Sequence, residues 1–146
     1  MTRRILHPSD FSPASRGAFR KAIEMAKASR AELLIVHVVN PIVPVAGEGY
    51  VSPKMYDEIA ASSRAWARKQ LDTLVAKARK SGVRARGLLL EGATHEQIVR
   101  AARTKRADLI VMGTHGRSGL AKLFLGSVAG RVVTAAPVPV LTVRAK

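Results

Sequence analysis

Residues 33–39 read Leu33-Leu34-Ile35-Val36-His37-Val38-Val39, a continuous apolar run that ends at Asn40-Pro41. Apolarity that continues rather than alternates indicates a strand covered on both faces, as in a parallel sheet. A second stretch of this kind runs from Asp108 to Met112, and a shorter strand is predicted over residues 4–7, where Pro8 ends it. A parallel sheet is therefore expected at the centre of the fold.

Helix signals separate the predicted strands. Ser12-Pro13 and Ser52-Pro53 each place a hydroxyl cap before a proline, which suits the first turn of a helix. The second of these helices should continue to about Ser81. Thr94, with Gln97 three residues later, predicts a capping box at the start of a shorter helix.

Strand and helix alternate four times, and a closing strand follows. The remaining strands are predicted over residues 83–90 and 138–143, and the last helix over about 127–136. Arg84 and Arg86 alternate in one of these strands and Pro139 interrupts the other, so partly exposed or edge positions are expected. This order predicts one domain over residues 1–146, of the Rossmann-like α/β class: an open five-stranded parallel sheet with helices on both faces.

The long helix after Ser52 carries an apolar stripe at helical spacing. Trp66, the only tryptophan of the chain, belongs to this stripe and is assigned to helix packing rather than to stacking on a base. The residues expected to be buried are Met55, Ile59, Trp66, Leu71, Leu74, Val75 and Ala78.

Composition narrows the classes of protein. The 146 residues include 25 Lys and Arg against 10 Asp and Glu, a formal charge of +15, and no cysteine. Disulfides and thiolate chemistry are thereby excluded. The charged N-terminus broken by Pro8 is unlike a signal peptide, and no apolar run approaches the ~18 residues of a membrane span. A soluble cytoplasmic protein is expected, and the positive charge favours polyanionic partners or serves solubility alone.

The candidate site lies at the carboxyl ends of the strands, where open parallel sheets bind ligands. The most informative stretch runs from Met112 to Val128 and contains Met112-Gly113-Thr114-His115-Gly116 and Gly126-Ser127-Val128. Glycines permit close approach of the backbone to a ligand, and a helix N-terminus suits a phosphate. Neither the Walker signature nor the dinucleotide fingerprint is present.

The spacing Gly-x2-Gly-x9-Gly-Ser is met by Gly113, Gly116, Gly126 and Ser127. Together with the opening Ile-Leu-x-Pro-x-Asp-Phe-Ser and the closing Pro-Val-Pro-Val-Leu-x-Val, it resembles the universal stress protein family, in particular its ATP-binding members. The resemblance covers the whole chain. It implies an ATP-binding stress-response protein that forms a homodimer through the C-terminal strand, with Mg²⁺ or Mn²⁺ carried on the phosphates.

The resemblance also implies roles for individual residues. It places Pro8 and Val38 in the adenine pocket and Asp10 near the ribose. It sets Met112 and Gly113 against the ribose and first phosphate. The residues implied at the remaining phosphates are Gly116, Gly126, Ser127 and Val128.

Structural alternatives exist for several of these residues. Gly113 and Gly116 are also typical of a tight turn, and Asp10 and Ser127 are typical of helix caps. His37 is typical of a satisfied core position, and His115 is typical of a solvated loop. No convincing catalytic base is present, so no catalytic residue is assigned, and slow ATP hydrolysis is the most that is expected. The alternatives are a basic nucleic-acid-binding protein and a weak ATPase or phosphotransferase.

Overall fold

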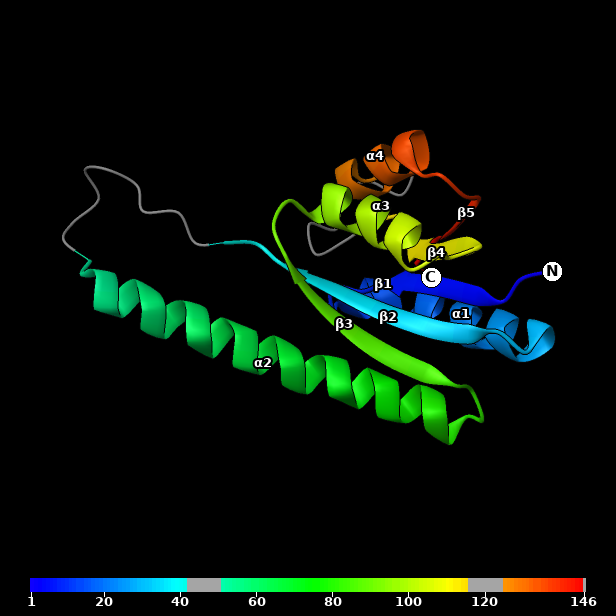
Figure 1. Ribbon diagram of the computed structural model, residues 1–146, viewed down its shortest axis with the longest axis horizontal. Coiled ribbons are helices and arrows are strands. Elements are labelled where there is room, and N and C mark those ends of the chain that lie inside the picture. The colour runs from blue at the N-terminus through cyan, green and yellow to red at the C-terminus, as the bar shows by residue number, and fades with distance from the viewer. Residues whose placement is uncertain (42–50, 116–124, 146) are drawn as a thin grey trace.

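The computed structural model describes residues 1–41, 51–115 and 125–145. Within these ranges, five parallel strands form one sheet in the order β3-β2-β1-β4-β5 (Figure 1). The strands are β1 (Arg4–Pro8), β2 (Glu32–Val39), β3 (Ala85–Glu91), β4 (Leu109–Gly113) and β5 (Val140–Val143). The predicted fold class is confirmed.

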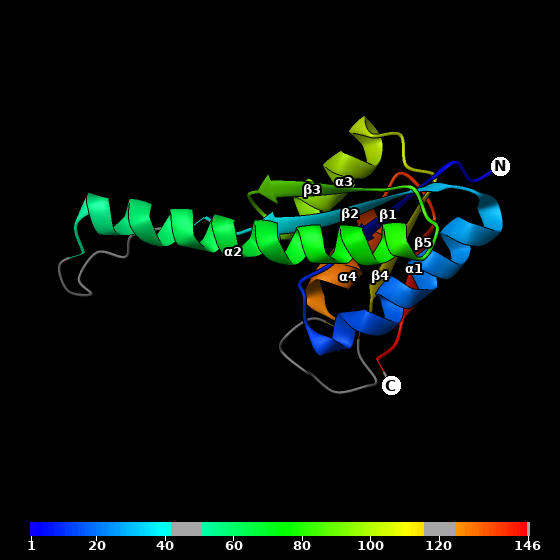
Figure 2. The same ribbon diagram turned by 90° about the horizontal axis from the view of Figure 1, so that it is seen from below.

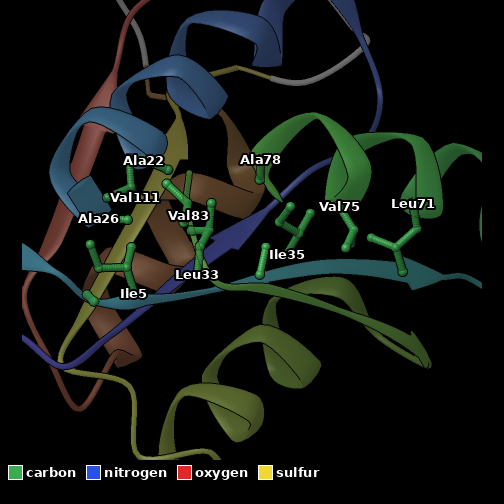
Figure 3. Packing of buried hydrophobic residues seen from close by; sticks show 12 residues of the cluster. Ile5, Ala22, Ala26, Leu33, Ile35, Leu71, Val75, Ala78, Val83 and Val111 are labelled. Atoms are coloured by element: carbon green, nitrogen blue, oxygen red, sulfur yellow. The ribbon is translucent and has the colours of Figure 1, made fainter. Parts of the chain in front are cut away.

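Helices cover both faces of the sheet (Figures 1 and 2). A 3-10 turn η1 (Pro13–Ser15) leads into α1 (Arg16–Ser29), which shares one face with α2 (Pro53–Lys80). On the other face lie α3 (Thr94–Thr104) and α4 (Ser127–Ala135). Figure 3 shows the first of the two apolar layers, in which Ile5, Leu33 and Ile35 of the strands pack under α1 and α2.

Both strands that were expected to be partly exposed lie at sheet edges. β3 forms one edge and β5 the other. The last strand begins at Val140 rather than at residue 138, although the Pro139 carbonyl already accepts a hydrogen bond from Ile110 N at 3.0 Å. Proline is tolerated there because it leads into an edge strand, where no partner needs its missing N–H.

Only one of the three predicted helix caps forms its side-chain hydrogen bond. Ser52 Oγ accepts a hydrogen bond from Met55 N at 3.2 Å, as expected for α2. Ser12 is the N-cap of η1 and Pro13 its first residue, as predicted, but the Ser12 side chain makes no capping hydrogen bond. The capping box at Thr94 is wrong: Ala93 is the N-cap of α3, and Thr94 Oγ1 donates instead to Asn40 Oδ1 at 3.1 Å.

The buried stripe of α2 is half as long as predicted. Leu71, Val75 and Ala78 are buried, whereas Met55, Ile59 and Trp66 are 50%, 47% and 48% exposed. A helix of 28 residues is about 42 Å long, but a strand of eight residues spans only about 26 Å. The N-terminal half of α2 therefore extends beyond the sheet, as both ribbon views show (Figures 1 and 2).

In the described part of the chain, no helix is both long enough and apolar enough to span a membrane.

The strand order reverses at β1, since the chain proceeds outward to β2 and β3 on one side and to β4 and β5 on the other. A crevice forms outside the carboxyl ends of the strands at such a switch point. The site is built there.

Candidate functional site

A cavity of about 720 Å³ opens at the carboxyl edge of the sheet. Its size lies within the roughly 300–1,000 Å³ typical of small-molecule sites. Eight of the nine residues expected in the site line this one cavity: Pro8, Asp10, Val38, Met112, Gly113, Gly126, Ser127 and Val128. Gly116, the ninth, lies outside the described residues.

Two backbone hydrogen bonds join the ends of β4, β5 and α4. Thr114 N donates to Val143 O at 3.0 Å, and Gly126 N donates to Thr114 O at 2.7 Å. A Cβ at position 126 would lie 2.9 Å from Thr114 O and 3.4 Å from His115 Cα. Glycine is therefore required at position 126 for the close approach of two backbone segments, which brings the start of α4 beside the end of β4.

The N-terminus of α4 faces the cavity without a side-chain cap. Gly126 is the N-cap, and Ser127 is the first helical residue, so the alternative that Ser127 serves as N-cap is wrong. The first N–H groups of a helix have no partner inside the helix, and they carry a partial positive charge. The Ser127 hydroxyl and these N–H groups provide donors at one end of the cavity, where Ser127, Val128 and Ala129 line it.

Asp10 has a structural role in the turn after β1. Its Oδ1 accepts a hydrogen bond from Ser12 N at 2.9 Å, which agrees with the capping alternative. The same residue also lines the cavity. A carboxylate has about four lone-pair sites, so the turn and a ligand hydroxyl can share it.

Three histidines lie close to the end of the sheet, and two of them line the cavity. His37 Nδ1 donates to Ser9 O at 2.8 Å, so His37 is a satisfied structural residue as expected. The prediction of a solvated His115 is wrong. Its Nδ1 is 3.0 Å from Thr114 Oγ1, and its Nε2 is buried with no hydrogen-bond partner among the described residues.

His7, the third histidine, lies in β1 and is completely buried. A carbonyl oxygen only accepts, so His7 Nδ1 donates to Val111 O, at 2.8 Å. Burial lowers the pKa of His7 to about 4, and the hydrogen bond to Val111 opposes that shift only in part. His7 is therefore neutral at physiological pH, with an unprotonated Nε2.

The sequence analysis missed one wall of the cavity. Ser62, Ser63, Trp66 and Ala67 of α2 line it, together with Asn40 after β2. The assignment of Trp66 to buried helix packing is wrong, because about half of its surface is exposed. The missed signal was spacing: Trp66 stands one residue before Ala67, and it is Ala67 that continues the buried series of Leu71 and Val75.

The fold and the cavity define a three-layer α/β domain, with a parallel sheet between two helical layers and a cavity at its topological switch point. The family model of the universal stress protein family matches residues 1–144, and the chain belongs to that family. The chain is 38% identical over 144 residues to the universal stress protein MJ0531 of Methanocaldococcus jannaschii, covering 97% of this chain and 82% of that protein.

Solved structures share the fold. The structure of MJ0577, from the same organism, has a TM-score of 0.79 and 27% identity, and it covers 100% of this chain and 98% of its own. A universal stress protein in complex with cAMP has a TM-score of 0.70 and 24% identity, with 99% and 98% covered. At that identity the second structure shows the fold alone.

Proposed function

We propose that this protein binds ATP in the cavity at the carboxyl edge of the sheet, and that the bound nucleotide acts as a signal or a structural ligand in a cytoplasmic stress response. One observation carries the proposal: the chain folds so that eight residues of the expected site, from four separate segments, line one cavity that ends at an uncapped helix N-terminus. The neighbour solved with cAMP is consistent with an adenine nucleotide, but the proposal rests on this chain's own residues.

The two ends of the cavity differ in chemistry. The N-terminus of α4 and Gly113 provide backbone donors and space for phosphates. Pro8 and Val38 provide an apolar surface that suits a base, with the backbone of β2 at its edge, and Met112 lies with Gly113 where the ribose and first phosphate are expected. Asp10 lies between the ends of β1 and η1, where a ribose hydroxyl can donate to it.

The chain provides little for a metal ion of its own. The described residues contain no group of three or more His, Asp or Glu that could hold one, and Asp10 is the sole carboxylate among the described residues lining the cavity. Mg²⁺ is commonly bound through one or two carboxylates and substrate phosphates rather than by a protein cage. Mg²⁺ or Mn²⁺ would therefore arrive with the nucleotide and neutralise its phosphates, with the Ser127 hydroxyl at the N-terminus of α4 as one oxygen ligand.

Turnover is expected to be slow. Hydrolysis needs a group that orients the attacking water. Among the described lining residues, Asp10 accepts a hydrogen bond from Ser12 N, and His37 Nδ1 donates to Ser9 O. His115 Nε2 has no hydrogen-bond partner among the described residues, but no second carboxylate among them lines the cavity to form an acid–base pair, so we propose at most a weak ATPase.

A calorimetric titration with Mg-ATP tests the proposal, with GTP and tripolyphosphate as comparison ligands. We expect ATP to bind more tightly than both. Ser127→Glu places a negative charge in the first turn of α4, which stabilises the helix but repels phosphates, so ATP binding should be lost. Val133→Glu adds the same charge to an exposed position of α4 outside the cavity and serves as control. Equal binding of ATP and tripolyphosphate, or equal effects of the two variants, would contradict the proposal.

We further propose that the protein is a homodimer joined along β5. The four residues of β5 are all partly exposed, and β5 is an edge strand. The carbonyls of Pro139 and Val143 accept hydrogen bonds from β4 and from the residue that follows it, so the alternating residues Val140 and Thr142 direct their backbone groups outward.

Sedimentation of the wild-type protein at micromolar concentration should show a dimer. Thr142→Pro should shift it to a monomer, and Thr142→Ala should not. A monomeric wild type would refute the interface.

A second candidate function, polyanion binding, is favoured by a basic hollow at the opposite end of the sheet. Lys27, Arg30 and Arg84 line it, with no acidic residue among its described lining residues. The C-termini of α1 and α2 lie beside it, but each carries only about half a negative charge, which leaves a large positive excess. The basic residues of the sequence also favour contacts along α2 and β3, where Arg86 is paired with Glu32 at 3.1 Å. The exposed cations there are Arg64, Arg68, Lys69, Lys77, Arg79, Lys80 and Arg86.

Binding of labelled single-stranded DNA, measured by anisotropy at several salt concentrations, tests this candidate. Affinity that falls steeply with salt and decreases in Arg84→Glu would support it. Affinity that is unaffected by Arg84→Glu would show that the general charge of +15 attracts the DNA without a defined surface.

A further inference from the structure

The cavity extends onto both faces of the sheet at the end of β2. Side chains alternate along a strand, so Val38 faces the α3 layer and His37 faces the α2 layer, yet both line the cavity. The expected nucleotide residues account for the α3 and α4 side. They leave unexplained the wall that α2 contributes, in which Trp66 lies with the hydroxyls of Ser62 and Ser63.

Trp66 is positioned by a series of rings. The Phe11 ring stacks on the His37 ring at 4.3 Å between centroids, and Trp66 meets Phe11 edge-on at 5.7 Å and 81°. Hydrogen bonds hold both supporting residues: Phe11 N donates to Ser9 Oγ at 3.1 Å, and His37 Nδ1 donates to Ser9 O at 2.8 Å. The indole thus packs against Phe11 on one side, lines the cavity and keeps 48% of the residue's surface exposed.

The backbone of Phe11 is strained. Its φ is +65°, a left-handed conformation that is rare for a bulky side chain. Such conformations persist where the surrounding structure imposes them, and they concentrate at functional sites. The strained conformation of Phe11 places its ring in contact with both His37 and Trp66, and this contact determines where the indole lies.

We infer that Trp66 is a base-contacting residue, and that α2 recognises the nucleobase through it. The inference rests on the proposed nucleotide-binding function. Indole faces stack on bases, and a purine offers the larger area. With the phosphates at α4 and the base at the end of β2, Trp66 closes the base end of the cavity, and its neighbours Ser62 and Ser63 can hydrogen-bond to the edge of the base.

Intrinsic fluorescence gives the first test, because Trp66 is the only tryptophan. Mg-ATP should change the emission of the wild-type protein with the same midpoint as calorimetric binding. Tripolyphosphate should bind without that change, since it has no base. ATP binding in the calorimeter with no change of emission would overturn the inference while leaving the proposed function intact.

Calorimetry on variants gives the second test. Trp66→Ala should weaken ATP binding roughly 5- to 100-fold and leave tripolyphosphate binding unchanged. Trp66→Phe should retain most of the affinity, because it keeps an aromatic face. Met55→Ala is the control, since Met55 is equally exposed on α2 but does not line the cavity.

The outcomes separate the two proposals. Wild-type protein that binds no ATP would refute the proposed function and the inference with it. Wild-type binding with no loss in Trp66→Ala, or with equal losses of ATP and tripolyphosphate affinity, would refute the role of Trp66 alone.

Discussion

Gly126 N donates a hydrogen bond to Thr114 O at 2.7 Å, and a Cβ on Gly126 would lie only 2.9 Å from the same oxygen. The third glycine of the Gly-x2-Gly-x9-Gly-Ser spacing is thus required by the protein's own backbone, before any ligand is considered. The contact fixes where α4 begins relative to the end of β4. The α4 end of the cavity, where we propose that phosphates bind, depends on that distance.

Gly126→Ala should therefore move the start of α4 away from β4. Contacts below 3.0 Å force a shift, and inserted methyl groups in packed regions cost about 1–3 kcal/mol. We expect a loss of stability of that size in urea denaturation, together with weaker ATP binding. Unchanged stability and affinity would show that the backbone yields easily at this junction.

Gly130→Ala is the matched substitution in the same helix, and it should have the opposite effect. A Cβ at position 130 would meet only Leu125 Cδ2, at 3.9 Å, which is an ordinary contact. Glycine inside a helix is about 1 kcal/mol less favourable than alanine. Urea denaturation should show a gain of about 1 kcal/mol, and a loss would mean that α4 needs the flexibility of glycine.

The strands and their order of alternation with helices could be predicted from the sequence because buried parallel strands are apolar without interruption. The stretches 33–39 and 108–112 illustrate this, and both edge strands carried a polar or proline residue that marked them. Helix caps were less predictable. Ser12 precedes Pro13 at the start of η1 as predicted, but Asp10 accepts from its N–H and its own side chain makes no cap, whereas Thr94 lies inside α3 and donates to Asn40.

The candidate site was predictable where a residue follows a strand, because topology alone brings the carboxyl ends of β1, β2 and β4 together. Trp66 was not predictable in this way. Ala67, Leu71 and Val75 follow one another at intervals of four and form the buried stripe, whereas Trp66 stands one residue before Ala67, about 100° around the helix from it. Met55 and Ile59 continue the stripe at intervals of four, and they are exposed because the sheet ends before it reaches them.

The two halves of α2 should respond differently to truncation of their apolar side chains. Leu71→Ala removes a fully buried side chain and should cost about 2–5 kcal/mol. Ile59→Ala lies on the half that extends past the sheet, and its effect should stay within about 0.5 kcal/mol. Urea denaturation of both variants measures the difference. A large loss in Ile59→Ala would indicate that a second protein surface covers this half of α2.

Stability should depend on pH through His7. Its pKa is about 4 in the folded protein, against an ordinary value of 6.5, because burial disfavours the charged ring. The unfolded chain therefore binds more protons between pH 6.5 and 4, so the free energy of unfolding falls as the pH is lowered through that window. At 1.36 kcal/mol per pKa unit, the loss from His7 alone amounts to roughly 3 kcal/mol.

His7→Asn tests this expectation, since an amide can donate to Val111 O and does not titrate. The variant should be less stable than wild type at pH 7.5, because a smaller side chain leaves space in the core. Its stability should nevertheless change less than that of wild type between pH 6.5 and 4.5. Asp108, whose pKa is lowered by hydrogen bonds from Arg3 N and Arg4 N, loses its contribution only at lower pH and does so in both proteins. Parallel pH profiles for the two proteins would show that a group other than His7 causes the acid sensitivity.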